Sequence, residues 1–191
     1  MKHKTYYFSK KKHVVYNEIF ADSEVFEKFY EIENAKDADM IVIPDGSVDI
    51  QCIWKDGRME ISICGSVMNG MTSRVNQADR CFGARFRVGV LPKEIREHLD
   101  IITDNRVSID KIVGLPDLRK YLSEELFLEQ KADFMLNLFE HGEKGTENEI
   151  ISYLLEEIEK HKGHIIVKDM IDGTGYSHRY VNHIFKSNVG C

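Results

Sequence analysis

The 191-residue sequence lacks the features of several protein classes. It has no apolar run approaching the roughly 18 residues of a membrane-spanning helix, and its first residues, Met1 to Phe8, lack the apolar stretch of a signal peptide. We therefore expect a cytoplasmic protein that does not enter a membrane. Only three prolines and 30% charged residues also argue against a disordered or fibrous chain.

Cysteine and histidine are too sparse for a metal or disulfide framework. Cys52, Cys64, Cys81 and Cys191 form no Cys-x-x-Cys pair, so we expect reduced core thiols. The first 90 residues contain only two histidines and lack the closely spaced pair that a metal site in a barrel needs. No glycine-rich phosphate loop or Gly-x-Ser-x-Gly elbow occurs. We expect no catalytic residues, no metal and no cofactor, and hence no enzyme.

Charge is distributed unevenly along the chain. The formal net charge is -6, which argues against a protein that coats nucleic acid over its whole surface. The segment from His161 to Cys191 instead contains four Lys and Arg residues against two Asp residues, and four of the eight histidines. A mildly basic tail on an acidic body suits a small nucleic-acid-binding unit attached to another domain.

Residues 1–90 are expected to form short β-strands. Apolar and polar residues alternate from Val48 to Trp54 and again from Phe82 to Val88, the pattern of half-buried strands. The turn Lys55-Asp56-Gly57-Arg58 separates the first run from a partner run, Met59 to Ile63, and predicts a hairpin. Short strands separated by glycine favour a sandwich or a barrel.

The pattern changes at Pro92. Residues 93–99 suit a short helix, and apolar residues from Leu118 to Phe139 recur at helical spacings. The expected linker is Gly142-Glu143-Lys144-Gly145. Residues 91–141 are thus predicted to be a helical connector, whose apolar face suits either a second copy of the chain or the β domain.

Residues 146–191 are predicted to form three helices. Thr146 begins a capping-box pattern before a helix with one apolar stripe. A short helix at about 166–171 is followed by the tight turn Gly173-Thr174-Gly175, and Ser177 caps a third helix. This order is typical of a helix-turn-helix module.

Several motifs resemble the AraC/XylS family of transcription regulators. Ile165 to Gly190 resembles the family's first helix-turn-helix, with matches at Gly175-Tyr176-Ser177, Tyr180-Val181, Phe185-Lys186 and Gly190. Ile43-Pro44-Asp45-Gly46-Ser47-Val48-Asp49 and Gly83-Ala84-Arg85-Phe86-Arg87-Val88-Gly89 are similar to paired motifs in one subgroup of the family's sensor domains. The resemblance implies an α+β fold: a cupin-like or jelly-roll β-barrel over residues 1–90, the connector over 91–141, and an all-α helix-turn-helix over 146–191.

The sequence departs from the family pattern at two points. Ile171 stands where the family usually has a small alanine, which would change how the second helix packs on the third. The family also binds DNA with two tandem helix-turn-helix units, and this sequence reaches Cys191 just after the first. We therefore expect a truncated form, which alone binds an operator weakly.

The resemblance implies contacts with double-stranded promoter DNA from the third helix. The predicted contact residues are Ser177, His178, Arg179, Asn182, His183 and Lys186. Arg179, Asn182 and His183 would contact base edges in the major groove, whereas Ser177 and Lys186 would bind phosphate. The plainer interpretation is a surface helix with solvated polar residues.

A small-molecule effector is predicted to bind inside the barrel. The candidate lining residues are Asp49, Gln51, Trp54, Arg74, Arg85 and Arg87. Arg85 and Arg87 on one strand face would favour an anionic ligand. Solvated arginines and a filled barrel are an equally good interpretation.

The expected function is sequence-specific regulation of transcription by a homodimer. An effector bound to the barrel would change the occupancy of promoter DNA by the helix-turn-helix. Two other classes stay open: a sensing or protein-interaction module without independent DNA binding, and a barrel enzyme. A steep fall of DNA affinity with salt would separate the regulator from the module without independent DNA binding. Turnover without DNA would support the barrel enzyme.

Overall fold

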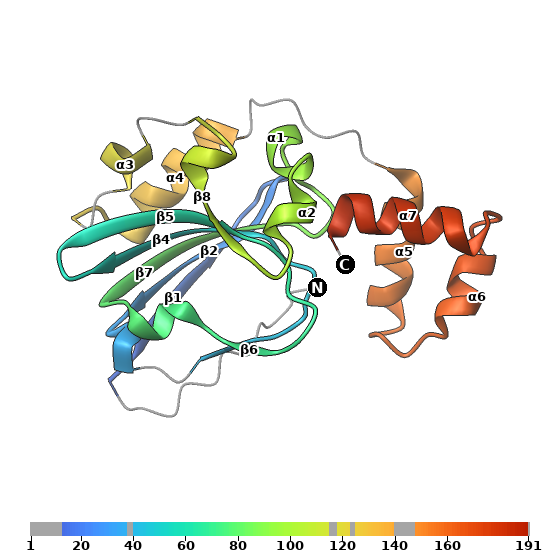
Figure 1. Ribbon diagram of the computed structural model, residues 1–191, viewed down its shortest axis with the longest axis horizontal. Coiled ribbons are helices and arrows are strands. Elements are labelled where there is room, and N and C mark those ends of the chain that lie inside the picture. Colours follow the sequence, from blue (N-terminus) through green and yellow to red (C-terminus); the bar gives the residue numbers. More distant parts are fainter. Residues whose placement is uncertain (1–12, 38–39, 115–117, 123–124, 140–147, 191) are drawn as a thin grey trace.

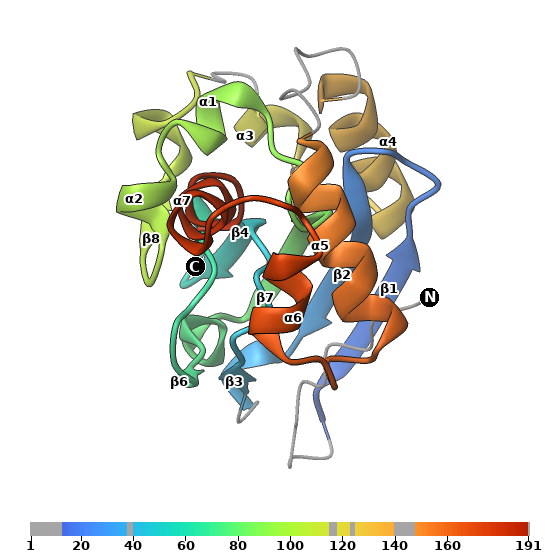
Figure 2. The same cartoon turned by 90° about the vertical axis from the view of Figure 1, so that its right-hand side faces the viewer.

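The computed structural model describes residues 13–37, 40–114, 118–122, 125–139 and 148–190. The fold is α+β: an antiparallel β-sheet with short helices on one face is followed by three C-terminal helices (Figure 1). Figure 2 views the molecule from the right-hand end of Figure 1, with the C-terminal helices in front of the sheet.

Six strands form the main sheet in the order β1-β2-β7-β4-β5-β8, with antiparallel neighbours throughout. Their bounds are Val15–Phe20 (β1), Phe26–Glu33 (β2), Asp49–Lys55 (β4), Arg58–Cys64 (β5), Arg80–Phe86 (β7) and Arg106–Ser108 (β8). A second, two-stranded sheet pairs β3 (Ile41–Val42) with β6 (Met71–Thr72). The predicted hairpin is confirmed: Asp56 and Gly57 both have positive φ, 50° and 70°, and join β4 to β5.

Alternation along the strands gives the sheet two different faces. On β4, Ile50, Cys52 and Trp54 lie in the large apolar core, whereas Ile53 lies in a smaller core on the other face. The large core is covered by α1 (Lys93–Arg96), α2 (Leu99–Ile102), α3 (Leu118–Tyr121) and α4 (Leu128–Phe139). The other face is covered by the β3–β6 pair and the 3-10 helices η1 (Ala35–Asp37) and η2 (Arg74–Gln77), with η3 (Ile109–Lys111) following β8.

Helix α4 is tied to the sheet by a buried ion pair. Lys131, which is fully buried, donates from Nζ to Glu31 Oε1 at 2.8 Å and lies 4.9 Å from the centre of the Trp54 ring. The apolar residues around Lys131, including Met135, pack into the large core. The apolar face of this helix was predicted to pack on a second copy of the chain or on the β domain, and in the structure it packs on the sheet of the β domain.

The predicted helical connector differs from the structure in two ways. Residues 91–141 include strand β8, where Val107 pairs with Ile63 of β5, so this segment belongs in part to the sheet. A three-residue strand is too short for its periodicity to be recognised. The expected helical region up to His141 also consists of two separate helices, α3 and α4.

The C-terminal helices are α5 (Glu149–Lys160), α6 (Val167–Asp172) and α7 (His178–Val189). Their common core is formed by Leu154, Met170, Ile171 and Val181. Ile171, which stands where a small alanine was expected, is 2% exposed and its larger side chain fills this core.

The helix ends confirm part of the prediction. Ser177 caps α7 as expected, because its Oγ accepts from the backbone N of Tyr180 at 3.3 Å. Helix α5 is instead capped by Asn148, whose Oδ1 accepts from Ile150 N at 3.1 Å. The predicted cap Thr146 and the linker 142–145 lie outside the described residues.

Gly65 should be indispensable to the packing of β5 against α2. A Cβ at this position would overlap the backbone of Ile102 and Thr103. We expect Gly65→Ala to lower the free energy of unfolding by about 1–3 kcal/mol through steric overpacking. Gly114→Ala is the matched control, because a Cβ there meets nothing within 4 Å. Urea denaturation measures both, and equal stabilities would contradict the predicted overlap.

Candidate functional site

A cavity of about 140 Å³ lies between the main sheet and the β3–β6 pair. Its floor consists of polar side chains from three neighbouring strands, Tyr30, Asp49, Gln51 and Arg85. Its walls come from loops, from η2, from the second sheet and from Ile32 and Arg106 of the main sheet. The other wall residues include Met40, Val42, Asp45, Ser47, Ser66, Val67, Met71, Thr72, Ser73, Val75, Asp104 and Asn105. Hydroxyl groups and aliphatic side chains thus share one enclosure.

The floor is organised by a buried ion pair between Arg85 and Asp49. The two residues are directly opposite each other on β7 and β4. Arg85 donates from Nε to Asp49 Oδ1 at 2.9 Å and from Nη2 to Asp49 Oδ2 at 3.0 Å, a bidentate geometry. Both side chains are almost completely buried, at 5% and 7% exposure.

Asp45 completes this arrangement from the loop before β4. Its Oδ2 accepts from Arg85 Nη1 at 2.9 Å, and its Oδ1 accepts from the backbone N of Ser47 at 3.0 Å. The segment Pro44-Asp45-Gly46 before β4 therefore supplies a second carboxylate to Arg85. The guanidinium charge is compensated within the protein.

A hydrogen-bond chain extends the floor away from Arg85. The hydroxyl of Tyr30 donates to Asp49 Oδ2 at 2.8 Å, and Gln51 Nε2 donates to the Tyr30 hydroxyl at 2.8 Å. Cys64 Sγ lies 3.3 Å from Gln51 Oε1 and donates to it. Gly83 makes room for the Tyr30 ring, since a Cβ at position 83 would coincide with ring atoms.

The cysteines within the described residues are free thiols. Burial raises the pKa of Cys52 to about 12, and burial also raises the pKa of Cys81 well above its ordinary value. Both thiols therefore stay protonated at neutral pH and are poor nucleophiles. Cys64 is half-buried, and Cys191 lies outside the described residues.

The structure brings together half of the predicted ligand residues. Asp49, Gln51 and Arg85 line the cavity, as expected. Trp54 points into the core on the opposite face of the sheet. Arg87 follows the end of β7 and is exposed, with its Nε donating to Ser23 O at 2.7 Å.

Two arginines remain to be compared with the prediction: Arg74, which was predicted to bind the ligand, and Arg106, which was not. The side chain of Arg74 lies outside the described part of the structure. Arg106 on β8 lines the cavity but was missed, because its strand is too short to be recognised from sequence.

The predicted DNA-contacting residues lie on the surface of the C-terminal helices. Ser177 and the helix residues His178, Arg179, Asn182, His183 and Lys186 are all exposed. His178 Nε2 lies 3.3 Å from Asp172 Oδ1 at the end of α6. They form the exposed side of α7, opposite the buried Val181.

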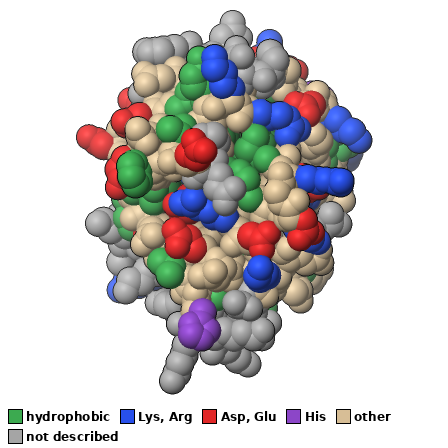
Figure 3. Space-filling model, turned by 90° about the vertical axis from the view of Figure 1, so that its left-hand side faces the viewer, with side chains coloured by type: hydrophobic (Ala, Val, Ile, Leu, Met, Phe, Trp, Pro, Cys, Tyr) green, Lys and Arg blue, Asp and Glu red, His purple; other side chains and the backbone are tan. Residues whose placement is uncertain are grey.

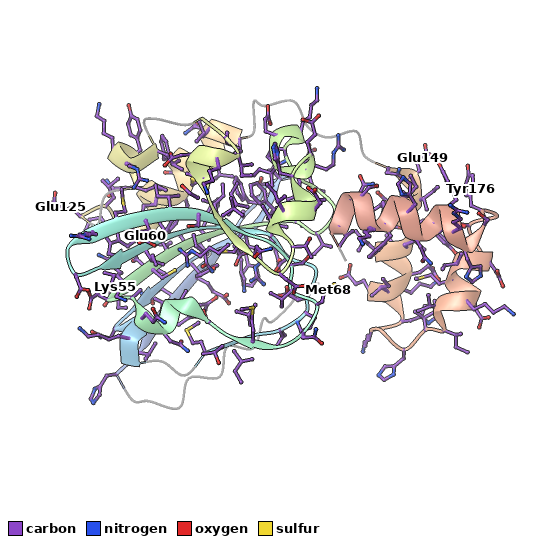
Figure 4. The ribbon with its side chains drawn as sticks, viewed as in Figure 1. Lys55, Glu60, Met68, Glu125, Glu149 and Tyr176 are labelled. Atoms are coloured by element: carbon purple, nitrogen blue, oxygen red, sulfur yellow. The ribbon has the colours of Figure 1, made fainter. Side chains whose placement is uncertain are left out.

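The C-terminal half of this surface faces a cleft between α7 and the sheet unit. The cleft has a volume of about 930 Å³. Asn182, His183 and Lys186 line one wall, and acidic residues near α2, including Glu97 and Asp100, line the other. Met68 also lines it and marks this side of the sheet unit in Figure 4, while Tyr176 marks the far end of the C-terminal helices.

The C-terminal end of α7 is held next to the cavity. Thr103 Oγ1 lies 3.0 Å from the carbonyl oxygen of Gly190 and 2.7 Å from that of Leu99, so its single hydrogen is shared between the two. Ser66 Oγ donates to the carbonyl of Val189 at 3.4 Å. Ser66 and Asp104 line the cavity, and Asp104 also lines the cleft. The cavity wall and the α7 anchor therefore share Ser66, and Asp104 of the wall follows Thr103 of the anchor directly.

The opposite end of the molecule has a different surface. In Figure 3, acidic and basic side chains are interspersed with apolar ones over the described part of that end. The described residues contain no group of three or more His, Cys, Asp or Glu side chains placed to hold a metal ion. None of the described helices is long and apolar enough to cross a membrane.

Comparison of the chain with protein-family models, curated proteins and solved structures finds no match.

Asp49→Asn should destabilise the protein by removing the charge that faces Arg85. Loss of one partner of a buried ion pair costs about 3–5 kcal/mol, and we expect the low end because Asp45 stays in place. Asp110→Asn is the matched control: its pair with Arg119 is exposed on both sides, so a loss of at most about 1 kcal/mol is expected. Urea denaturation at neutral pH compares them, and equal losses would contradict the structural role of this pair.

Proposed function

We propose that this chain is a sequence-specific DNA-binding regulator of transcription of the AraC type. In this proposal α6, the turn at residues 173–177 and α7 form a helix-turn-helix, and α7 enters the major groove. The observation that carries the proposal is the position of Arg179, Asn182 and His183. All three are exposed on the helix that follows the tight turn.

The chemistry of this surface suits a DNA duplex. The guanidinium of Arg179 pairs well with guanine O6 and N7, and the amide of Asn182 pairs well with adenine N6 and N7. Ser177 caps α7 and Lys186 lies in its last turn, and in this proposal both would contact phosphates and set the position of the helix. Apolar side chains pack α7 against α5 and α6, so its polar residues are directed away from that core.

The sheet unit is proposed to sense a small molecule, in the role of the family's cupin-like barrel. The enclosed cavity supports this proposal because it combines apolar walls with placed polar groups. Dimerisation stays a prediction, and the apolar face of α4 is already used by the sheet.

Sensing and DNA binding would be coupled through the docking of α7. Asn182, His183 and Lys186 line a cleft whose other wall is the region around α2, and a duplex with α7 in its major groove would occupy the position of that wall. Lys186 and its neighbours would therefore have to leave α2 before they reach DNA. Ser66 touches both the cavity and the end of α7, so a ligand that displaces Ser66 would favour release.

The second candidate is a sensing or protein-interaction module without independent DNA binding. It is favoured by the same cleft, because Asn182, His183 and Lys186 face the sheet unit. Under this alternative, α7 serves only to pack against α2.

Arg179→Ala should weaken sequence-specific binding. Duplexes are first selected from a random-sequence pool with the wild-type chain, and their affinities are measured by fluorescence anisotropy. Loss of a bidentate base contact costs about 1–3 kcal/mol, so we expect a roughly 5- to 150-fold loss for the selected duplex and little change for a scrambled one.

The control variant is Arg58→Ala, which removes the same charge from the exposed β4–β5 hairpin. Its affinity for the selected duplex should stay within about twofold of wild type, because an isolated charge far from the duplex is screened by salt. If no duplex is enriched, or if both variants bind as wild type does, DNA reading by α7 is refuted and the second candidate is favoured.

Loosening the α7 anchor should increase DNA affinity. Thr103→Val keeps the shape of the side chain but removes the hydroxyl, which lies within hydrogen-bond distance of Gly190 O in the anchor and of Leu99 O in α2. A hydrogen bond contributes about 0.5–1.5 kcal/mol, so the apparent affinity should rise about two- to tenfold if docking competes with DNA. Ser108→Ala, outside the anchor, is the control, and unchanged affinity in Thr103→Val would show that docking does not compete.

A further inference from the structure

Arg106 carries a charged group whose bonding is incomplete. Its Nη2 atom is buried and has no hydrogen-bond partner among the residues that the structure describes. Arginine stays protonated in proteins, and a buried donor without an acceptor costs about 1–3 kcal/mol, more when the group is charged. An acceptor that is not part of the described chain would relieve this cost.

Arg106 lies on β8, the edge strand of the main sheet, and it lines the cavity. Arg106 pairs with Cys64, which in turn pairs with Asp49, so all three side chains lie on the cavity face. Burial raises the pKa of the Cys81 thiol on β7, and the charge of Arg106 acts in the opposite direction.

The carboxylates that line the cavity already have partners. Both oxygens of Asp49 and both oxygens of Asp45 accept hydrogen bonds from Arg85, Tyr30 or Ser47. Asp104 Oδ1 accepts from the backbone N of Met68 at 2.7 Å. The acidic groups of the cavity are thus engaged in the fold, while the buried nitrogen of Arg106 is not.

The rest of the cavity is suited to a small, mainly apolar molecule. Met40, Val42 and Val75 supply aliphatic walls, and Ser66 and Asn105 supply polar groups near β8. The volume of about 140 Å³ is close to the roughly 150 Å³ of an apolar cavity that binds benzene. A ring or short alkyl chain with one anionic group would use both kinds of surface.

We propose that the cavity binds a small organic acid, with its carboxylate at Arg106 and its apolar body against Met40 and Val75. This site specifies the ligand of the proposed sensing function. Only the effect of the ligand on α7 depends on the proposed function. The ligand charge is assigned to Arg106 and not to Arg85, because Arg85 is compensated by Asp45 and Asp49.

The test compares acids with their neutral amides by isothermal titration calorimetry of the full chain. The probes are benzoate and hexanoate against benzamide and hexanamide, because each pair has nearly the same shape and differs in charge. We expect saturable binding of at least one acid, about tenfold or more tighter than its amide, as a charge-assisted hydrogen bond provides. Inorganic phosphate serves as a second anion, and it should bind no more tightly than the amides.

Two variants locate the site. Arg106→Gln should weaken binding of the acid by about tenfold or more and leave the amide unchanged. Arg106→Lys, which keeps the charge, should retain part of the preference for the acid. Arg58→Gln is the matched control on the exposed hairpin and should bind as wild type does. Thermal unfolding of each variant checks its fold.

Several results would overturn the proposal. Equal binding of acid and amide, absence of binding by either acid, tighter binding of phosphate, or full acid binding by a folded Arg106→Gln would each do so. The comparison of acid with amide uses the wild-type chain, so it decides the ligand charge even if a variant does not fold. No DNA takes part, so a failure here is separate from a failure of DNA recognition.

Discussion

The ion pair between Arg85 and Asp49 is the interaction on which the sheet unit depends. It joins β7 to β4 at the centre of the sheet, and Asp45 extends it to the loop before β4. Removing charges from water is costly, and only complete hydrogen bonding offsets that cost. The bidentate geometry and the Tyr30 hydroxyl provide this bonding. Together these contacts form a rigid polar floor, above which a cavity is kept open.

The cavity and α7 are connected through Ser66 and through Thr103, a residue of the predicted connector. Ser66 lies in the cavity wall and also donates to Val189 at the end of α7. Thr103, one residue before Asp104 of the same wall, holds Gly190. Regulation requires two states in which such contacts differ. The docked state buries part of the α7 surface against α2, and a released state would free it for DNA.

The sequence predicted those elements in which local signals are strong. The Asp56-Gly57 hairpin, the alternating strand around Phe82 and the Ser177 cap each follow from a pattern within a few residues. Strand β2 was not located, because both of its faces are covered and its residues do not alternate. Strand β8 is held by its pairing with β5, a contact between residues far apart in sequence.

The same limits explain which residues of the candidate site were predicted wrongly or missed. Trp54 was grouped with Asp49 and Gln51, although it lies on the other face of β4 by alternation. Arg87 shares the alternation of Arg85, but β7 ends at Phe86 and the chain turns away. The compensation of Arg85 by Asp45 and the position of Arg106 depend on strand order, which a single sequence does not contain.

Hydrogen–deuterium exchange of the chain, with and without a duplex selected from a random pool, tests DNA recognition by α7 most directly. DNA should slow amide exchange in the turn and in α7 between Gly175 and Lys186, and should speed exchange around Ser66 and Thr103 as the anchor is released. The β4–β5 hairpin, which lies far from α7, should be unaffected (Figure 4). Unchanged exchange in α7, or slowing confined to the sheet unit, would contradict DNA recognition by this helix.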